Sequence, residues 1–432
     1  MRTRGAPLGA LTLILFATAL PLGAQSLKET IDLALAHDAS IASAERGLEA
    51  ARLEATAAAR AALPTLSLGG SYQYDTSVPT ATISIGAKSQ SLSLGQNNNV
   101  DLNAGVKWTP FTGFAQEAGV ELARLQALLA DNSVDSAHTE VALSTITAFR
   151  QVQAAMLQIE TLTSAAGRAQ LQLDQTQSLE RQGMATKVDV LSLSIARLDY
   201  DQKLIEAKVG LADAHERLKS LTGKEIEVPA PPEEEMKVEL PPLRAEGLSQ
   251  IKALAIQGDI LETNRTLARS KLYPTVALTG AFHYGMPGLD QTEEQWMAYG
   301  TAGVLVTWAY DWGGDSLKVQ AAERDLERLA SDSTSAREGI ELDYDSAVRD
   351  YGAAGEALKV LRASLDLARD KMGIVKSQYE QGLASTTDFN DANLQLTRAE
   401  LDYRTQLLSM MLKASQIDAL SGKSLDQWSV AQ

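Results

Sequence analysis

The chain of 432 residues contains no cysteine. This absence excludes a disulfide framework, thiolate metal sites, a cysteine nucleophile and lipid attachment through a lipobox cysteine. The 55 acidic residues outnumber the 39 basic ones, and the formal net charge is −16. Because phosphates dominate nucleic-acid affinity, a chain this acidic is a poor candidate for binding nucleic acid.

Long apolar runs are scarce as well. Beyond the first residues, no stretch approaches the roughly 18 uninterrupted apolar residues of a membrane-spanning helix. Residues 1–24 combine a basic start, an apolar segment and the small residues Gly23-Ala24, which is typical of a cleaved secretory signal peptide. An uncleaved N-terminal membrane anchor is the alternative.

Motifs for catalysis are also missing. The four histidines, His37, His138, His215 and His283, are scattered and have no metal-ligand spacing. No nucleophile-elbow, zinc-protease or dinucleotide-binding motif occurs. We therefore expect no enzyme activity, no metal site and no cofactor.

What the sequence does contain is an internal repeat. Residues 63–68 resemble residues 273–278, and Arg181-Gln-Gly-Met-Ala-Thr-Lys-Val-Asp189 resembles Glu380-Gln-Gly-Leu-Ala-Ser-Thr-Thr-Asp388. Two further matches follow in the same order, and such self-similarity indicates a duplicated unit. We predict these divisions after the signal peptide: first repeat 25–222, proline-rich linker 223–245, second repeat 246–422 and C-terminal tail 423–432.

Each repeat holds one long helical pattern that no proline interrupts, over about 114–181 and 314–380. Apolar residues there step by three and four, as in Leu358, Leu361 and Leu365, which is the spacing of a coiled-coil seam. The simplest packing lays two short helices end to end beside each long one. We expect these short helices at about 26–63, 187–222, 246–272 and 386–421.

Alternation with a period of two predicts a β-hairpin at about 65–108 and another at about 275–308. Residues 100–108, for example, place Val, Leu, Ala, Val and Trp at every second position, with Asp, Asn, Gly and Lys between them. Polar loops are expected between the strands, at 89–99 and 288–295. The fold is therefore predicted to be mixed α and β, mostly α, with four strands per chain.

Thirteen of the 22 aromatic residues fall within 65–114 and 273–312. Six of them cluster where each hairpin returns to its long helix, which is where an aromatic girdle would lie if the strands crossed a lipid bilayer. A soluble β-sandwich with aromatic residues in its core is the alternative. The six candidate membrane-interface residues are Trp108, Phe111, Phe114, Trp308, Tyr310 and Trp312.

The number of strands bears on assembly. Four strands cannot close a barrel, and an open sheet edge is not tolerated in lipid. Two chains would supply eight strands, whose interior side chains just fill. Three chains would supply twelve strands, enough for a barrel with a lumen. They would also supply twelve parallel columns of helix beneath it, each column being one long helix or two short helices end to end. We infer a trimeric β-barrel continued by a helical tube.

Several short motifs resemble the TolC-type outer-membrane efflux protein family over nearly the whole mature chain. They are Leu63-Pro64-Thr65, Tyr273-Pro274-Thr275, Trp308-Ala-Tyr-Asp-Trp-Gly-Gly314 and the helix-hairpin tips Gly183–Thr186 and Gly382–Ser385.

The resemblance implies a TolC-like homotrimer in the cell outer membrane, with a 12-stranded barrel and a large periplasmic α-barrel. It would be the passive exit duct of a tripartite efflux or type I secretion system. A periplasmic adaptor (membrane fusion) protein and an inner-membrane transporter of RND, ABC or MFS type would dock and open its periplasmic gate. The alternative is a periplasmic coiled-coil adaptor or chaperone-like structural protein.

The segment from Tyr379 to Asp391 resembles the gating segment of that family. Asp388 and Asp391 are spaced i, i+3 and share a helix face, so three copies would form two carboxylate rings that favour cations. Tyr379 and Asp189 match family positions that link neighbouring hairpins in the closed state. Ala384 stands where the family often has arginine, so a charge lock at that position is absent.

Helix capping is the competing interpretation of this segment. Thr186 with Asp189, and Ser385 with Asp388, are near matches to capping boxes at helix starts, and first-turn aspartates also suit the helix dipole. Capping would explain Asp189 and Asp388 but does not require Asp391.

The two tips are also the candidate docking site for the adaptor, because their glycines and small residues permit close approach. Their being turns and nothing more is the alternative. The candidate docking residues are Gly183, Met184, Ala185, Thr186, Gly382, Leu383, Ala384 and Ser385.

Overall fold

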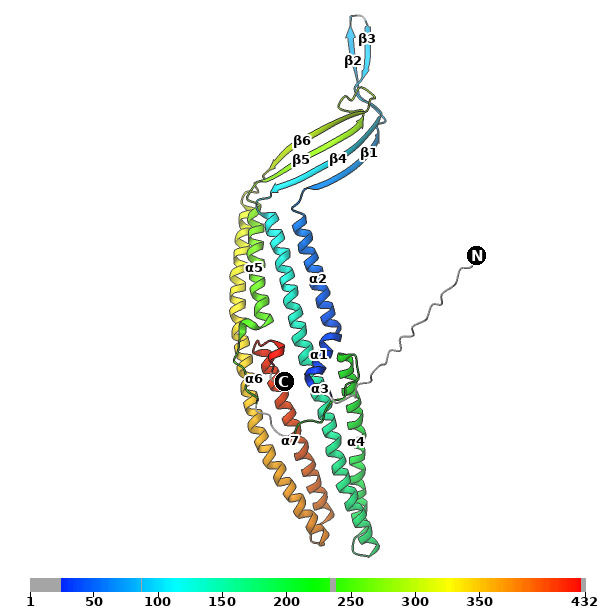
Figure 1. Cartoon of the computed structure of the whole chain (residues 1–432), viewed down its shortest axis with the longest axis vertical. Coiled ribbons are helices and arrows are strands. Elements are labelled where there is room, and N and C mark those ends of the chain that lie inside the picture. The colour runs from blue at the N-terminus through cyan, green and yellow to red at the C-terminus, as the bar shows by residue number, and fades with distance from the viewer. Residues whose placement is uncertain (1–24, 87, 234–237, 429–432) are drawn as a thin grey trace, which may run out of the picture. The chain divides into compact units, whose positions relative to one another are not determined.

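The computed structural model describes residues 25–86, 88–233 and 238–428 (Figure 1). The chain divides into two compact units. Unit 1 comprises the described residues of Met1–Ala36, Thr145–Glu235 and Leu358–Leu408, and unit 2 comprises those of His37–Ser144, Met236–Ala357 and Ser409–Gln432. Within these described ranges, no helix combines the length and the apolar character needed to cross a membrane.

The helices repeat in length from one half of the chain to the other. The two long helices have 67 residues each, α2 and α5 have 22 each, and α4 and α7 have 36 and 35. This confirms the two internal repeats and the mostly helical fold. The helices are α1 (Leu27–His37), α2 (Ala39–Arg60), α3 (Ala115–Arg181), α4 (Lys187–Thr222), α5 (Ser249–Ser270), α6 (Gly314–Glu380) and α7 (Thr386–Leu420), with short 3-10 helices η1 (Ala245–Gly247) and η2 (Leu425–Gln427).

The expectation of one unbroken helix over 26–63 is wrong. The backbone leaves the helical region at Asp38, with φ −64° and ψ 129°, and α2 begins anew at Ala39. The Asp38 carboxylate accepts a hydrogen bond of 2.8 Å from the Ser40 amide, which satisfies one of the unpaired donors of a new helix start. The second repeat has a related break, because η1 precedes α5 there.

Four strands form one antiparallel sheet in the order β1-β4-β5-β6, as expected (Figure 1). The first two come from the first repeat and the last two from the second. Each long helix begins a few residues after the second strand of its repeat. The strands are β1 (Thr65–Tyr74), β4 (Asn98–Phe111), β5 (Thr275–Met286) and β6 (Met297–Thr307).

The polar loop expected over 89–99 is wrong in part, because a second hairpin lies between β1 and β4. It pairs β2 (Thr80–Ile85) with β3 (Lys88–Ser93). Gly86 has φ +66°, a conformation that favours glycine and suits a tight hairpin turn. Serine and threonine alternate with apolar residues in β2, so the polar composition concealed a period-two pattern.

Strand register places the apolar residues of the four-stranded sheet on one face. Leu102 of β4 lies opposite Gly70 and Tyr284, and Val106 lies opposite Leu66 and Gly280. The large apolar side chains of this face are exposed in the single chain, up to 80% for Leu68. The face carries Leu66, Leu68, Tyr72, Leu102, Val106, Leu278, Phe282, Tyr284, Val304 and Val306, all of them exposed.

The opposite face of the sheet is mostly polar. Asp101 of β4 lies opposite Ser71 and Gly285, and its carboxylate hydrogen-bonds His283 of β5 at 3.0 Å. The His283 ring stacks on Tyr299 of β6, with ring centroids 5.0 Å apart. An apolar face outside and a wet face inside is the pattern of a strand in a membrane barrel.

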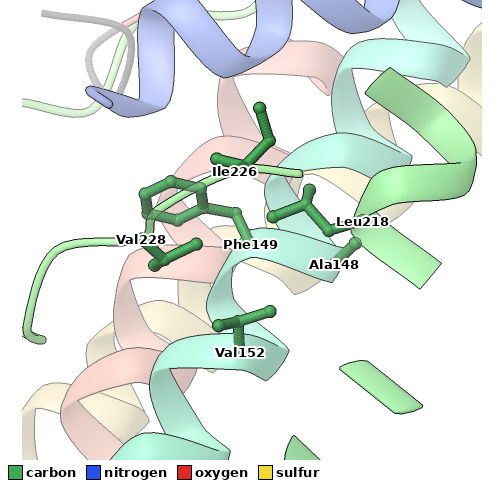
Figure 2. Packing of buried hydrophobic residues seen from close by; sticks show 6 residues of the cluster. All are labelled: Ala148, Phe149, Val152, Leu218, Ile226 and Val228. Atoms are coloured by element: carbon green, nitrogen blue, oxygen red, sulfur yellow. The ribbon is translucent and has the colours of Figure 1, made fainter. Parts of the chain in front are cut away.

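The core of unit 1 includes part of the proline-rich connection. Ala148, Phe149 and Val152 of α3 pack with Leu218 of α4 and with two residues that follow α4 (Figure 2). Those two residues are Ile226 and Val228, exposed by only 3% and 5%.

In unit 2, the expected C-terminal tail contributes a buried anchor. Trp428 is 1% exposed, and its indole donates a hydrogen bond of 3.4 Å to the Lys423 carbonyl.

Candidate functional site

Both helix hairpins turn by the same device. Gly183 and Gly382 have φ +73° and +72°, the left-handed region where glycine avoids a Cβ penalty. The amide of Met184 donates to the Leu179 carbonyl at 2.9 Å, and the amide of Leu383 donates to the Gln378 carbonyl at 2.8 Å. This is the Schellman arrangement, which ends a helix by satisfying its last carbonyls.

The helices that follow these turns begin with matching caps. Thr186 and Asp189 form a capping box at α4, in which the Asp189 amide donates to the Thr186 hydroxyl oxygen at 3.2 Å. Ser385 and Asp388 make the same bonds at α7, where the Ser385 amide donates to the Asp388 carboxylate at 2.9 Å. The capping interpretation of both aspartates is therefore confirmed as geometry.

Hydrogen bonds also join the two hairpins to each other. The Tyr379 side chain of α6 is buried, and its hydroxyl lies 2.8 Å from the Thr176 hydroxyl of α3 and 3.3 Å from the Thr386 hydroxyl of α7. Thr386 in turn donates to the Asp189 carboxylate of α4 at 2.8 Å. The structure thus brings Tyr379 and Asp189 into one network, with Thr386 as the intermediate that the sequence did not indicate.

The acidic pair of α7 faces outward. Asp388 and Asp391 are both exposed. Among the described residues, Asp391 has no hydrogen bond or ion pair, whereas Asp388 accepts bonds from Ser385. These bonds lower the pKa of Asp388, and bonds from Thr186 and then Thr386 lower the pKa of Asp189. Both caps therefore stay charged at neutral pH.

A second polar network, missed from the sequence, lies further along α7. The Arg168 guanidinium of α3 donates to the Asn393 amide oxygen at 2.6 Å, and the Asn393 nitrogen donates to the Tyr200 hydroxyl of α4 at 3.3 Å. Asn393 is 1% exposed, and burial lowers the pKa of Arg168. The available signal was an asparagine at a core spacing between Phe389 and Leu396, because one polar residue in an apolar seam often fixes register.

The six candidate membrane-interface aromatics lie at the helix side of the sheet, in unit 2. Phe111 is half-buried at the end of β4, and the others are exposed by 41% to 90%. Phe114 meets the Phe111 ring edge-on at 5.6 Å and the Tyr273 ring at 5.8 Å. The Trp308 indole donates to the Leu272 carbonyl at 3.3 Å. An apolar ring with a bonded polar group suits a membrane–water boundary.

No group of three or more histidine or acidic residues within the described ranges could hold a metal ion. The helix caps and polar networks instead place charged carboxylates and hydrogen-bonding side chains at and near the ends of the two helix hairpins.

A family model described as outer membrane efflux protein matches residues 30–224 and 245–423. The chain therefore belongs to the outer membrane efflux protein family. The protein is located in the outer membrane and has a large helical portion in the periplasm. Its family and fold are those of passive channels.

Individual relatives agree with this family. The chain is similar to the outer membrane protein TolC of Vibrio cholerae, at 22% identity over 92% of each chain. Its fold matches the CmeC outer membrane channel of Campylobacter jejuni, with a TM-score of 0.77, 14% identity and coverage of 100% of this chain and 96% of that one. It also matches the outer membrane protein VceC of Vibrio cholerae, with a TM-score of 0.73, 17% identity and coverage of 91% and 96%.

We predict that Asp189→Asn will loosen both tips at neutral pH. A lowered folded-state pKa means that the Asp189 charge stabilises the fold above the ordinary aspartate pKa of about 3.9. That contribution disappears as the pH falls through the lower folded value. Hydrogen exchange, corrected for intrinsic rates, should therefore be several-fold faster in residues 184–192 and 379–390 of the variant at pH 7, and the difference from wild type should shrink as the pH is lowered below the ordinary aspartate pKa of about 3.9.

Asp213→Asn, which changes an exposed acid away from both tips on the same helix, is the matched control for this measurement. Its tip exchange should equal that of wild type at every pH. Equal exchange of Asp189→Asn and wild type at pH 7 would contradict the network.

Proposed function

We propose that three copies of this chain form an exit duct that conducts substrates from the periplasmic end through the outer membrane. The observation that carries this proposal is the four-stranded sheet, with one exposed apolar face and one mostly polar face. Lipid would cover the first face, and water in the lumen would wet the second. The duct would serve a tripartite efflux or type I secretion system.

Three copies are favoured by the count of strands. β1 and β6 are the edges of the sheet, and a barrel that closes must pair each edge with another strand. Eight strands from two copies would leave an interior filled by side chains, whereas twelve strands from three copies leave room for a lumen. Three copies are thus the smallest assembly that both closes and conducts.

The first experiment is membrane fractionation followed by native mass measurement of the detergent-extracted full chain. We expect an outer-membrane protein with three times the mass of the mature chain. A soluble periplasmic monomer would contradict the duct and favour a periplasmic adaptor or chaperone-like protein instead.

We further propose that Asp388 and Asp391 line a gate at the periplasmic end. Their exposed carboxylates lie one turn apart at the start of α7, so three copies would stack two acidic rings in a narrow opening. The Tyr379, Thr386 and Asp189 network would hold α7 against the first hairpin in the closed state. Opening would then require these hydrogen bonds to exchange partners.

The double variant Asp388→Asn/Asp391→Asn tests the gate. Asparagine keeps the size of each side chain and removes two charges per copy, so we expect lower cation selectivity in planar bilayers. The measurement is the reversal potential of single channels across a salt gradient. Asp213→Asn serves as control and should leave the potential unchanged, and a wild-type potential in the double variant would contradict the gate.

The hairpin tips are the proposed docking site for a periplasmic adaptor, behind which an inner-membrane transporter of RND, ABC or MFS type would sit. Met184 and Leu383 directly follow the two turn glycines and are exposed by 64% and 75%. Large apolar side chains at an exposed turn are available to a partner.

Single cysteines at Met184 and Leu383 test docking in this cysteine-free chain. We expect each to form a crosslink with the adaptor in cells when a short thiol-reactive photocrosslinker is attached. Leu53→Cys on α2, at 65% exposure in unit 2, is the control and should give no adduct. Absence of an adduct at both tips would count against docking there.

A further inference from the structure

The polar face of the four-stranded sheet carries a cluster in which a carboxylate contacts an imidazole. The Asp101 carboxylate accepts a hydrogen bond of 2.8 Å from the Asn103 side-chain amide. Its two oxygens lie 3.0 Å and 3.2 Å from Nδ1 of His283. These residues come from adjacent strands, because Asn103 of β4 lies directly opposite His283 of β5. Strand register therefore brings together side chains that are 182 positions apart in the sequence.

Two glycines leave the space that this cluster occupies. Gly69 of β1 lies opposite Asn103, and a Cβ at Gly69 would come within 2.9 Å of the Asn103 side-chain oxygen. Gly285 of β5 lies opposite Asp101, and a Cβ there would come within 2.8 Å of the Val100 carbonyl oxygen and 3.4 Å of the Asp101 carboxylate. A glycine within a strand often marks such a close approach. The strands on both sides of β4 are thus shaped around the polar side chains.

Tyr299 of β6 holds the imidazole from the other side. It lies directly opposite His283, and the two rings stack with centroids 5.0 Å apart and planes 8° apart. A carboxylate can only accept, so Nδ1 carries the proton of the neutral ring and Nε2 is free to bind another. Nε2 has no hydrogen bond within the described residues, and 24% of the His283 side chain is exposed. The ring is therefore fixed in place and open to protons from water.

Few other charged groups share this face of the sheet. Asp101 from β4 and Tyr299 from β6 are the titratable groups that face the His283 ring within the described strands. Lys107 lies on the same face of β4, four residues from Asn103, which is roughly 14 Å along a strand. Asp75, just beyond β1, accepts a hydrogen bond of 2.8 Å from the Asn99 side chain.

We propose that Asp101 and His283 form a ring inside the barrel whose charge makes the ion selectivity of the duct depend on pH. This inference rests on the proposed trimeric duct, in which the polar face of the sheet would line the lumen. Histidine is the side chain that ordinarily changes charge between pH 5 and 8. Above this range each copy contributes the single negative charge of Asp101, and below it the imidazolium balances that charge.

The sign of the effect follows from the sign of the ring. Rings of acidic side chains favour cations in pores, so the duct should select cations more strongly at high pH. Lysine and aspartate ordinarily titrate near pH 10.4 and 3.9, far outside the range in which histidine changes charge. Lys107 and the aspartates of the proposed gate would therefore contribute a constant background.

Reversal potentials of single channels across a salt gradient, measured at pH 8 and at pH 5.5, test the ring. Low ionic strength is needed, because the Debye length is about 30 Å at 0.01 M and only about 10 Å at 0.1 M. For the full wild-type chain we expect the cation-over-anion permeability ratio to be roughly twofold lower at pH 5.5 than at pH 8.

Two variants separate the members of the ring. His283→Gln keeps a polar side chain that does not titrate, so its selectivity should stay at the pH 8 value of wild type at both pH values. Asp101→Asn removes the fixed charge, so it should lose cation selectivity at pH 8 and shift toward anions at pH 5.5, where the imidazolium is left unbalanced.

His37→Gln is the matched control, because His37 is exposed at the end of α1 and lies outside the sheet. It should keep the pH dependence of wild type, and so should the variant Asp388→Asn/Asp391→Asn. A conducting channel whose selectivity is equal at both pH values, or a pH dependence that survives His283→Gln, would overturn the ring while the duct stands. A wild-type chain that forms no channel would overturn the duct and the ring together.

Discussion

The unpaired edges of the four-stranded sheet are the constraint on which the rest of the molecule depends. Within the described strands, β1 and β6 each pair on one side only. Water can satisfy such an edge, but lipid cannot, and burying an unpaired backbone amide costs about 2–7 kcal/mol. In the proposed duct, a chain with this sheet finds its missing strands in other copies. The long helices would share that symmetry, because each begins a few residues after a strand of the sheet.

The contacts that hold α7 to the first hairpin differ in kind from an apolar seam. Tyr379, Thr386 and Asp189 form one set of hydrogen bonds, and Arg168, Asn393 and Tyr200 form another. A hydrogen bond within a protein contributes only about 1 kcal/mol net, because water offers a replacement when it breaks. Separating packed apolar residues has no such compensation, since their surface becomes exposed to water. Polar links would thus suit the proposed gate, in which α7 parts from its neighbours and returns.

The sequence was most informative where apolar residues recur with a single spacing over a long stretch of the chain. The two 67-residue helices and the four strands followed from steps of three and four and from alternation, because burial on one face imposes these periods. It was least informative where a single side chain determines the local structure through its hydrogen bonds. Asp38 breaks a helix by capping the next one, and Asn393 sits among apolar positions because Arg168 and Tyr200, distant in sequence, satisfy it. The gate and docking residues came from resemblance, and their roles stay predictions.

The two helix-hairpin tips share a backbone but differ in chemistry. Both turn on a left-handed glycine and restart on a hydroxyl–aspartate cap, yet only the second has an acid one turn further on, Asp391, where the first has Ser192. Three copies with two tips each would present six tips with the same backbone shape. Their charge would alternate around the ring, because every second tip carries the additional aspartate. A partner that contacts all six tips would then meet two kinds of surface in turn. The duplicated repeats would thus give the ring of tips an approximate sixfold symmetry in its backbone, while the side chains keep the symmetry threefold.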